Sequence, residues 1–175
     1  GAEKIPKKKG IVFIKHSSVY ELFVGLVLFS PSSWVAKYEL MYLPLFRKAI
    51  KVFGFIPVKR GFGKSEVSRV IRDGTARLGQ GNWIVIFPEG TRVPHGETKR
   101  YGLSGALLAV GTSSNITPIA HNAGRYWGRR SLIKKKGSIV FSIGSQISTF
   151  GKSYDEINEE AKTWIDAETK RIDSL

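Results

Sequence analysis

The sequence lacks cysteine entirely and has only three histidines among its 175 residues. Without cysteine there is no disulfide framework, no thiolate nucleophile and no cysteine-based zinc site, and the chain fits a reducing compartment. The histidines are His16, His95 and His121, and none belongs to the His-Glu-x-x-His spacing of zinc hydrolases. We therefore expect neither a metal site nor a Ser-His-Asp triad.

Long apolar runs are also missing. No stretch reaches the roughly 18 consecutive apolar residues of a membrane-spanning helix, and the longest run is Leu22–Phe29. The chain opens with the charged, proline-containing segment Gly1–Pro6, which is unlike a signal peptide. A strand pattern already begins at Ile11, so we expect residues that include a membrane anchor to precede this sequence.

Acidic residues are scarce relative to basic ones. Lysine and arginine total 28 against 14 aspartate and glutamate residues, which gives a formal net charge of +14. Such an excess favours a polyanionic partner, whether nucleic acid, an anionic membrane or a phosphorylated metabolite. Short charge runs are often only solvated loops, but the size of the surplus indicates a functional basic face. The clusters are Lys7-Lys8-Lys9, Lys59-Arg60, Lys99-Arg100, Arg129-Arg130 and Lys134-Lys135-Lys136.

What is present is typical of a globular protein, with 42% hydrophobic and 11% aromatic residues. The length suits one domain with a sizeable core, and the chain shows no internal repeat and no linker. We therefore expect residues 1–175 to form a single domain.

Apolar runs alternate with helical patterns along the whole chain. Runs typical of buried strands cover Ile11–Lys15, Trp34–Tyr38, Phe55–Lys59, Trp83–Phe87, Ile116–Ala120 and Ser138–Ile143. Helices are predicted from Ser17 or Ser18, as a cap, to Phe29, and over Leu40–Phe53 with an interruption near Pro44, Glu66–Leu78, Leu103–Val110 and Tyr154–Arg171. This alternation predicts an α/β fold with a mainly parallel mixed sheet flanked by helices.

Sites in such sheets gather beyond the carboxyl ends of the strands, and the first strand is followed by His16. A carboxylate that fixes the tautomer of a histidine makes the ring a better base. On one continuous helix, residues five apart diverge by about 140°, so Glu21 could not reach His16. It can do so only if His16 ends the strand, a serine caps the helix and Glu21 lies in the first helical turn. By itself, a histidine and a glutamate at this spacing are common by chance.

The most apolar strand leads into the segment Phe87-Pro88-Glu89-Gly90-Thr91-Arg92. Gly90 lets the backbone approach a ligand, Arg92 offers a planar fork for phosphate oxygens, and Glu89 can accept from a hydroxyl. Chemistry alone leaves a surface turn with a glutamate–arginine ion pair equally open.

Two further strand exits are less informative. Lys59 and Arg60, followed by Gly61, either hold a phosphate or form a solvated strand end. The strand Ile116–Ala120 contains Pro118, which predicts a sheet edge or a strand start because proline cannot donate a backbone hydrogen bond.

Taken in order, these segments resemble the 1-acyl-sn-glycerol-3-phosphate acyltransferase group of the glycerolipid acyltransferases. His16–Glu21 corresponds to the group's His-x-x-x-x-Asp motif, Phe55–Arg60 to its second motif, and Ile116–Ala120 to its fourth. The third motif, Phe-Pro-Glu-Gly-Thr-Arg, occurs unchanged at Phe87–Arg92 and is the specific part. The resemblance spans roughly residues 1 to 150, including the opening Gly1–Pro6. The chain departs from the commonest pattern at Glu21, Lys59 and Val93, where the group often has Asp, Asp and Ser.

The resemblance implies an O-acyltransferase in which His16 is the general base and Glu21 orients it. The acceptor hydroxyl attacks an acyl thioester, which is acyl-CoA or the acyl carrier protein conjugate, and no other cofactor is implied. Lysophosphatidate is the implied acceptor and phosphatidic acid the product. Glycerol 3-phosphate or another lysolipid remains an alternative acceptor.

The same resemblance assigns substrate-binding residues. Arg60 and Arg92 would hold the acceptor phosphate, while Glu89 and Gly90 would shape the glycerol pocket. Thr91 would assist through its hydroxyl or its backbone.

Members of this group usually carry an N-terminal membrane segment, which implies a location at the cytoplasmic face of a bacterial inner membrane. Leu22–Phe29 and Leu40–Phe46 are candidates for an acyl groove or for contact with the membrane; alternatively they pack on the sheet. The non-catalytic alternatives are a basic lipid-binding module and a nucleic-acid binder. The resemblance implies no nucleic-acid partner, and the basic clusters lack interleaved aromatic residues.

Overall fold

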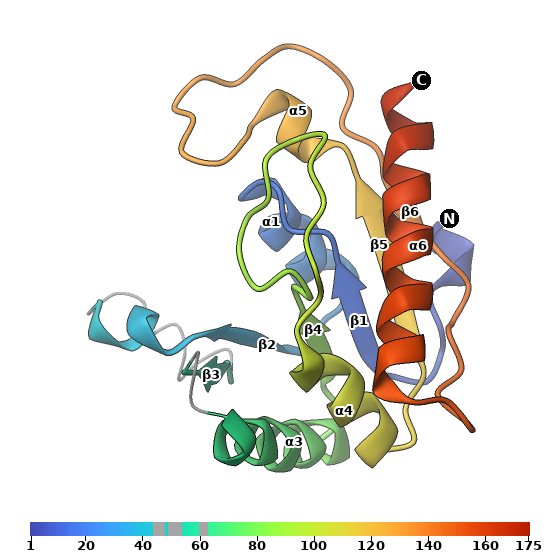
Figure 1. Ribbon diagram of the computed structural model, residues 1–175. Coiled ribbons are helices and arrows are strands. Elements are labelled where there is room, and N and C mark those ends of the chain that lie inside the picture. The colour runs from blue at the N-terminus through green and yellow to red at the C-terminus, as the bar shows by residue number, and fades with distance from the viewer. Residues whose placement is uncertain (44–47, 49–53, 60–62) are drawn as a thin grey trace.

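A computed structural model describes residues 1–43, 48, 54–59 and 63–175 (Figure 1). Within them, six strands form one sheet, whose order differs from the order of the chain. From one edge to the other the strands are β3 (Ile56–Val58), β2 (Ser32–Lys37), β4 (Trp83–Ile86), β1 (Ile11–Ile14), β5 (Ile116–His121) and β6 (Phe141–Ile143). The six predicted strands are therefore confirmed, with ends that move by at most three residues.

The sheet is parallel except at one edge. The first residue of β1, Ile11, lies opposite Ile84 of β4 on one side and Ile116 of β5 on the other. Only β6 runs antiparallel, with Ile143 opposite Ile119. The carboxyl ends of β1, β4 and β5 consequently lie side by side at the same end of the sheet. The predicted mainly parallel mixed sheet is therefore confirmed.

Helices cover both faces of the sheet. Phe13 of β1 belongs to a core cluster with residues of α3, α4 and α6, whereas its neighbour Val12 packs in a second cluster with Phe29 at the end of α1. Successive residues of a strand point to opposite faces, so β1 is buried from both sides. The helical elements are η1 (Ala2–Lys4), α1 (Tyr20–Leu28), η2 (Tyr38–Tyr42), α3 (Gly63–Gly79), α4 (Leu103–Gly111), α5 (Ala123–Tyr126) and α6 (Tyr154–Asp173).

Glycine allows α1 to approach the sheet closely. A Cβ atom at Gly25 would lie 2.4 Å from Cη2 of the buried Trp34 in β2. Any larger residue here would push the helix outward. Gly25 thus helps to set the position of α1, whose first turn follows directly on the end of β1.

Two expectations about local structure need correction. Pro118 lies inside β5, which is an interior strand and not a sheet edge. The carbonyl of Pro118 accepts from the backbone N–H of Gly144, just after β6 has ended at Ile143, so the hydrogen-bonding side of Pro118 faces β6. The N–H that proline lacks would have pointed the same way, so no hydrogen bond between β5 and β1 is lost. Of the predicted helix Leu40–Phe53, the structure shows a 3-10 turn through Tyr42; the rest, apart from residues 43 and 48, lies outside the described residues.

Candidate active site

The structure pairs His16 with Glu21. The two side chains meet with 2.8 Å between Nδ1 of His16 and Oε1 of Glu21. Because an ionised carboxylate can only accept, Nδ1 carries the hydrogen and donates it to Glu21. The other ring nitrogen, Nε2, is then the basic one, and the His16 side chain is 18% exposed.

A sharp turn between β1 and α1 makes this pairing possible. Oε1 of Glu21 also accepts from the backbone N–H groups of Ser17 and Ser18, at 3.1 and 2.9 Å. Glu21 therefore fixes the turn that leads into α1. The hydroxyl of Ser18, one of the two predicted caps, accepts from the N–H of Tyr20 in the first helical turn at 3.2 Å, although the N-cap position itself is held by Val19, which makes no side-chain cap. The carboxylate is fully buried, so the hydrogen bonds from these three donors are what stabilise it there.

Phe87 fixes the plane of the imidazole. Its ring stacks on that of His16 with centroids 3.9 Å apart and an interplanar angle of 14°. The ring of Trp34 packs in turn against Phe87, with centroids 5.5 Å apart. The base is thereby restrained by packing as well as by its hydrogen bond to Glu21.

The segment after β4 holds the backbone of His16 from both sides. The backbone N–H of His16 donates to Oε2 of Glu89 at 3.2 Å, and its carbonyl accepts from the N–H of Val93 at 2.7 Å. Gly90 turns the segment with φ of +66°, in the left-handed region that glycine adopts without strain. The first and third motifs are therefore one structural unit.

Glu89 is a buried carboxyl, with only 5% of its surface exposed. Burial raises its pKa to about 7, while the nearby ammonium of Lys15 acts in the opposite direction. Near neutral pH this group thus exchanges a proton readily, unlike an ordinary surface glutamate.

A buried charge network lies behind Glu89. Nζ of Lys15, which is 3% exposed, is 3.9 Å from Oε1 of Glu89 and 3.9 Å from Oδ1 of Asp166 in α6. Asp166 in turn binds Lys162 at 2.7 Å. Sequence reasoning missed Lys15 and Asp166. Lys15 could have been found, because a lysine directly after an apolar strand is unusual. Asp166 could not, because it is one of many charged residues on the polar helix α6.

His121 joins the exits of β5 and β1. Its Nε2–H donates to the carbonyl of Lys15 at 2.7 Å, and its Nδ1 accepts from the N–H of Ala123 at 3.2 Å. Complete burial lowers the pKa of His121, so the ring is neutral with both nitrogens engaged. It lies 4.0 Å from Oε2 of Glu21 and supports the site as a scaffold, which the sequence did not predict.

The remaining predicted residues divide into two groups. Thr91 and Arg92 are half-buried and directly precede Val93, so their backbone runs beside His16. Arg60 lies outside the described residues. Its neighbour Lys59 donates its backbone N–H to Glu66 of α3 at 2.6 Å, which attaches the end of β3 to that helix.

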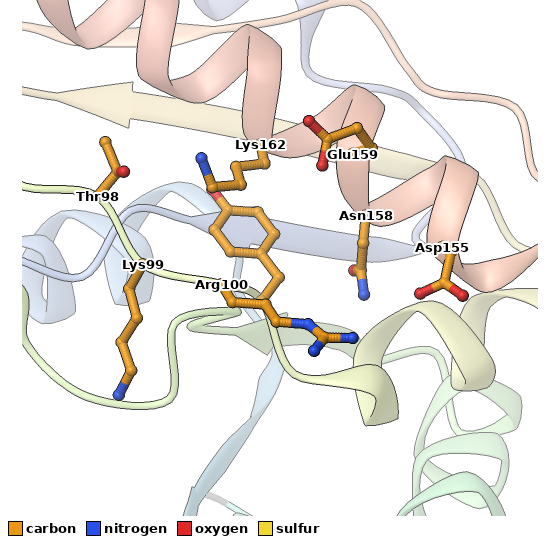
Figure 2. Close-up of a pocket in the computed structure, with 8 residues that line it drawn as sticks. Thr98, Lys99, Arg100, Asp155, Asn158, Glu159 and Lys162 are labelled. Carbon is orange, nitrogen blue, oxygen red and sulfur yellow. The ribbon is translucent and has the colours of Figure 1, made fainter.

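A cavity of about 400 Å³ lies between the segment 98–101 and the first turns of α6 (Figure 2). Figure 2 shows Arg100 extending toward Asn158 and Asp155, while Lys99 points away from the helix. The cavity walls carry charges of both signs, and none of the predicted site residues that the structure describes lines them. Its walls are Thr98, Lys99, Arg100, Tyr101, Asp155, Asn158, Glu159 and Lys162.

The described part of the chain offers neither a metal site nor a membrane span. Among those residues, no group of three or more histidine, aspartate or glutamate side chains is arranged to hold a metal ion. Likewise, no helix within the described ranges is long and apolar enough to cross a bilayer.

Known proteins resemble this chain in sequence and in structure. A 1-acyl-sn-glycerol-3-phosphate acyltransferase of Pseudomonas aeruginosa is 36% identical over 168 residues, which cover 94% of this chain and 65% of the relative. Another protein of the same name, from Borreliella burgdorferi, is 23% identical over 178 residues and is covered to 71%. The crystal structure of PlsC, the 1-acyl-sn-glycerophosphate acyltransferase of Thermotoga maritima, has the same fold, with a TM-score of 0.83 at 20% identity over all of this chain and 71% of that one.

The chain thus spans just under two thirds of the length of the Pseudomonas relative. The sequence profile of one family, described as Acyltransferase, matches residues 1–122, which contain the His16–Glu21 pair and the segment Phe87–Arg92. On the profile and the Pseudomonas sequence together, the chain belongs to the Acyltransferase family.

Proposed function

We propose that this chain transfers a fatty acyl group from an acyl thioester to the sn-2 hydroxyl of 1-acyl-glycerol 3-phosphate, which yields phosphatidic acid, and that residues 1–175 form the catalytic domain. The donor is acyl-CoA or acyl carrier protein. The names of the relatives support the substrate class. The observation that carries the proposal is the 2.8 Å contact between His16 and the buried Glu21 at the carboxyl end of β1.

His16 acts as the general base in this mechanism. Its Nε2 removes the proton of the acceptor hydroxyl as the oxygen attacks the thioester carbonyl. The C–S bond then breaks, and the imidazolium returns its proton to the leaving thiolate. Glu21 stabilises the imidazolium between these steps and keeps the ring in the reactive tautomer. No acyl-enzyme forms, because the substrate's own hydroxyl is the nucleophile.

Arg92 and Arg60 bind the acceptor phosphate. A guanidinium group suits this task because its fork of donors matches phosphate oxygens. Gly90 and Thr91 border the glycerol moiety, since they lie in the segment that is bonded to the backbone of His16. Glu89 acts chiefly on His16, through the hydrogen bond it accepts from the backbone.

The acceptor is a lipid, so the enzyme works at a membrane surface, which we place at the cytoplasmic face of a bacterial inner membrane. The net charge of +14 supports this location because anionic lipids attract basic surfaces. Part of the run Leu22–Phe29 is available for contact with the membrane. Phe23 and Val27 are 57% and 80% exposed, whereas Leu22 and Leu26 pack on the core.

The test is an acyl-transfer assay with purified protein, long-chain thioesters and a panel of acceptors. His16→Ala should lower the rate by roughly 10²–10⁴-fold, the usual contribution of a general base. His95→Ala is the matched control, because His95 is a half-exposed residue that pairs with Asp173 at 3.5 Å. Activity that survives His16→Ala would refute the assignment. Lysolipid binding without thioester consumption, or salt-dependent DNA binding alone, would favour a non-catalytic module.

A further inference from the structure

A basic loop, residues 127–137, lies between α5 and β6 and carries two adjacent aliphatic side chains at its tip. Leu132 is 96% exposed and Ile133 is 75% exposed. Single exposed aliphatic residues are ordinary, but two consecutive ones at the tip of a loop indicate a surface that becomes covered.

The loop is held in shape at its base. The indole N–H of Trp127 donates to the carbonyl of Ser131 at 3.1 Å, and the backbone N–H of Lys135 donates to the carbonyl of Tyr126 at 2.8 Å. Nζ of Lys134 lies 4.6 Å from the centroid of the Trp127 ring. These contacts close the loop on both sides of Leu132 and Ile133 and present the two side chains outward.

Cations flank the aliphatic pair on both sides. The sequence has no aspartate or glutamate anywhere between Glu97 and Asp155, so no acidic side chain within the loop neutralises its charge. The five cationic residues of the basic loop are all exposed: Arg129, Arg130, Lys134, Lys135 and Lys136.

The basic loop lies at the same end of the sheet as His16, beyond the carboxyl ends of β1 and β5. It follows α5, where a Cβ atom at Gly124 would lie 2.7 Å from Oγ of Ser17, the residue after His16. Figure 1 shows the loop extending over the end of β5 on the side of α1 and of the segment after β4. A surface that covers Leu132 would therefore also lie on the side of the sheet where the partly exposed His16 is found.

We propose that the basic loop inserts Leu132 and Ile133 into the surface of an anionic membrane while its cations contact the lipid headgroups. Apolar side chains surrounded by lysine and arginine are what anionic bilayers retain. An acidic protein partner would pair with the cations but would also need a groove for the protruding pair. The inference rests on the proposed function only in that a membrane lipid is the acceptor.

The first test measures sedimentation of the 175-residue chain with vesicles. Leu132→Gln with Ile133→Gln should weaken binding to mixed phosphatidylcholine–phosphatidylglycerol vesicles by roughly tenfold or more, since two buried aliphatic groups are lost. Phe150→Gln is the matched control. Phe150 is 93% exposed but lies at the opposite end of the sheet, where the strands begin. Its neighbour Thr149 donates its hydroxyl to the carbonyl of Ser114, just before the start of β5. It should bind as the unchanged protein does.

The second test separates the charge of this loop from the charge of the whole chain. Replacing Lys134, Lys135 and Lys136 by glutamine should reduce binding at low salt on the order of 100-fold and flatten its salt dependence. Replacing Lys7, Lys8 and Lys9, which precede β1 at the opposite edge, removes the same charge and should change binding much less.

Because the chain has no cysteine, Leu132→Cys and Phe150→Cys each accept one environment-sensitive fluorophore. A blue shift on anionic vesicles confined to position 132 supports insertion. Equal responses at both positions, or vesicle binding unaffected by Leu132→Gln with Ile133→Gln, overturns it. Loss of binding to acidic acyl carrier protein, with vesicle binding unchanged, also overturns it in favour of a protein partner. Acyl transfer between water-soluble short-chain substrates reports on the proposed function separately and should survive these loop changes.

Discussion

Replacing Glu21 by glutamine tests whether the buried carboxylate drives catalysis through its charge. Glutamine has nearly the same shape, and its amide oxygen can still accept from the backbone N–H groups of Ser17 and Ser18 and from Nδ1 of His16. The hydrogen bonds that form the turn are thereby retained, while the negative charge 2.8 Å from the imidazole is lost. The fold should persist and the stabilisation of the imidazolium should not.

The geometry gives the size of the effect. Two unit charges 2.8 Å apart interact by about 6 kcal/mol at an effective dielectric constant of about 20. This is an upper limit, because the amide dipole of glutamine replaces part of the interaction. At about 1.4 kcal/mol per factor of ten, the expected loss of kcat is roughly 10²–10⁴-fold. Glu21→Asp, which keeps the charge on a shorter side chain, should lose less.

The assay follows release of the free thiol from the acyl thioester, and the absence of cysteine removes background from the protein. Circular dichroism and the midpoint of thermal unfolding establish that each variant is folded. A folded Glu21→Gln protein that keeps more than about a tenth of the activity would refute the reasoning, because the charge would then supply less than about 1.4 kcal/mol of stabilisation.

Two predictions concern stability. Because burial raises the pKa of Glu89 to about 7, the folded state holds its proton more tightly than the unfolded state, so the free energy of unfolding should fall by about 3 kcal/mol between pH 4.5 and pH 7. Denaturant titrations of Glu89→Gln should lack this decline, and an unchanged pH dependence would contradict the assignment. Gly25→Ala should lower the stability by about 1–3 kcal/mol, since the new Cβ would lie 2.4 Å from Trp34. Gly111→Ala, whose Cβ would meet Ile71 at an ordinary 3.5 Å, is the control, and equal effects of the two substitutions would argue against close packing at Gly25.

Much of the fold was predictable because its elements are defined locally. The apolar runs Ile11–Lys15 and Trp83–Phe87 became β1 and β4, and the helical pattern at Tyr154–Arg171 became α6. The prediction for Pro118 failed because a proline is tolerated inside a sheet when its missing donor faces a strand that has already ended. Periodicity describes one strand and carries no information about its neighbours.

The candidate site was predictable as far as its residues directly follow the carboxyl ends of strands. Parallel strands end at one edge, so the residues after β1 and β4 had to come close together. His16 and Glu21 meet as the proposed strand–cap–helix junction required, and the hydroxyl of Ser18 accepts from the N–H of Tyr20 although Val19 holds the N-cap position. The roles of Arg92 and Thr91 remain predictions, and that of Arg60 concerns a residue outside the described ranges.

By itself, the sequence determined the alternation of strands and helices, the pairing of His16 with Glu21 and the position of the segment Phe87–Arg92. Each depends on residues that are close along the chain or on the common edge of parallel strands. Only the tertiary structure decided that Lys15 contacts Asp166 of α6, and that the chain between β5 and β6 exposes its aliphatic tip. Contacts between distant segments depend on the order of strands and on helix packing, for which no spacing in the sequence is a guide.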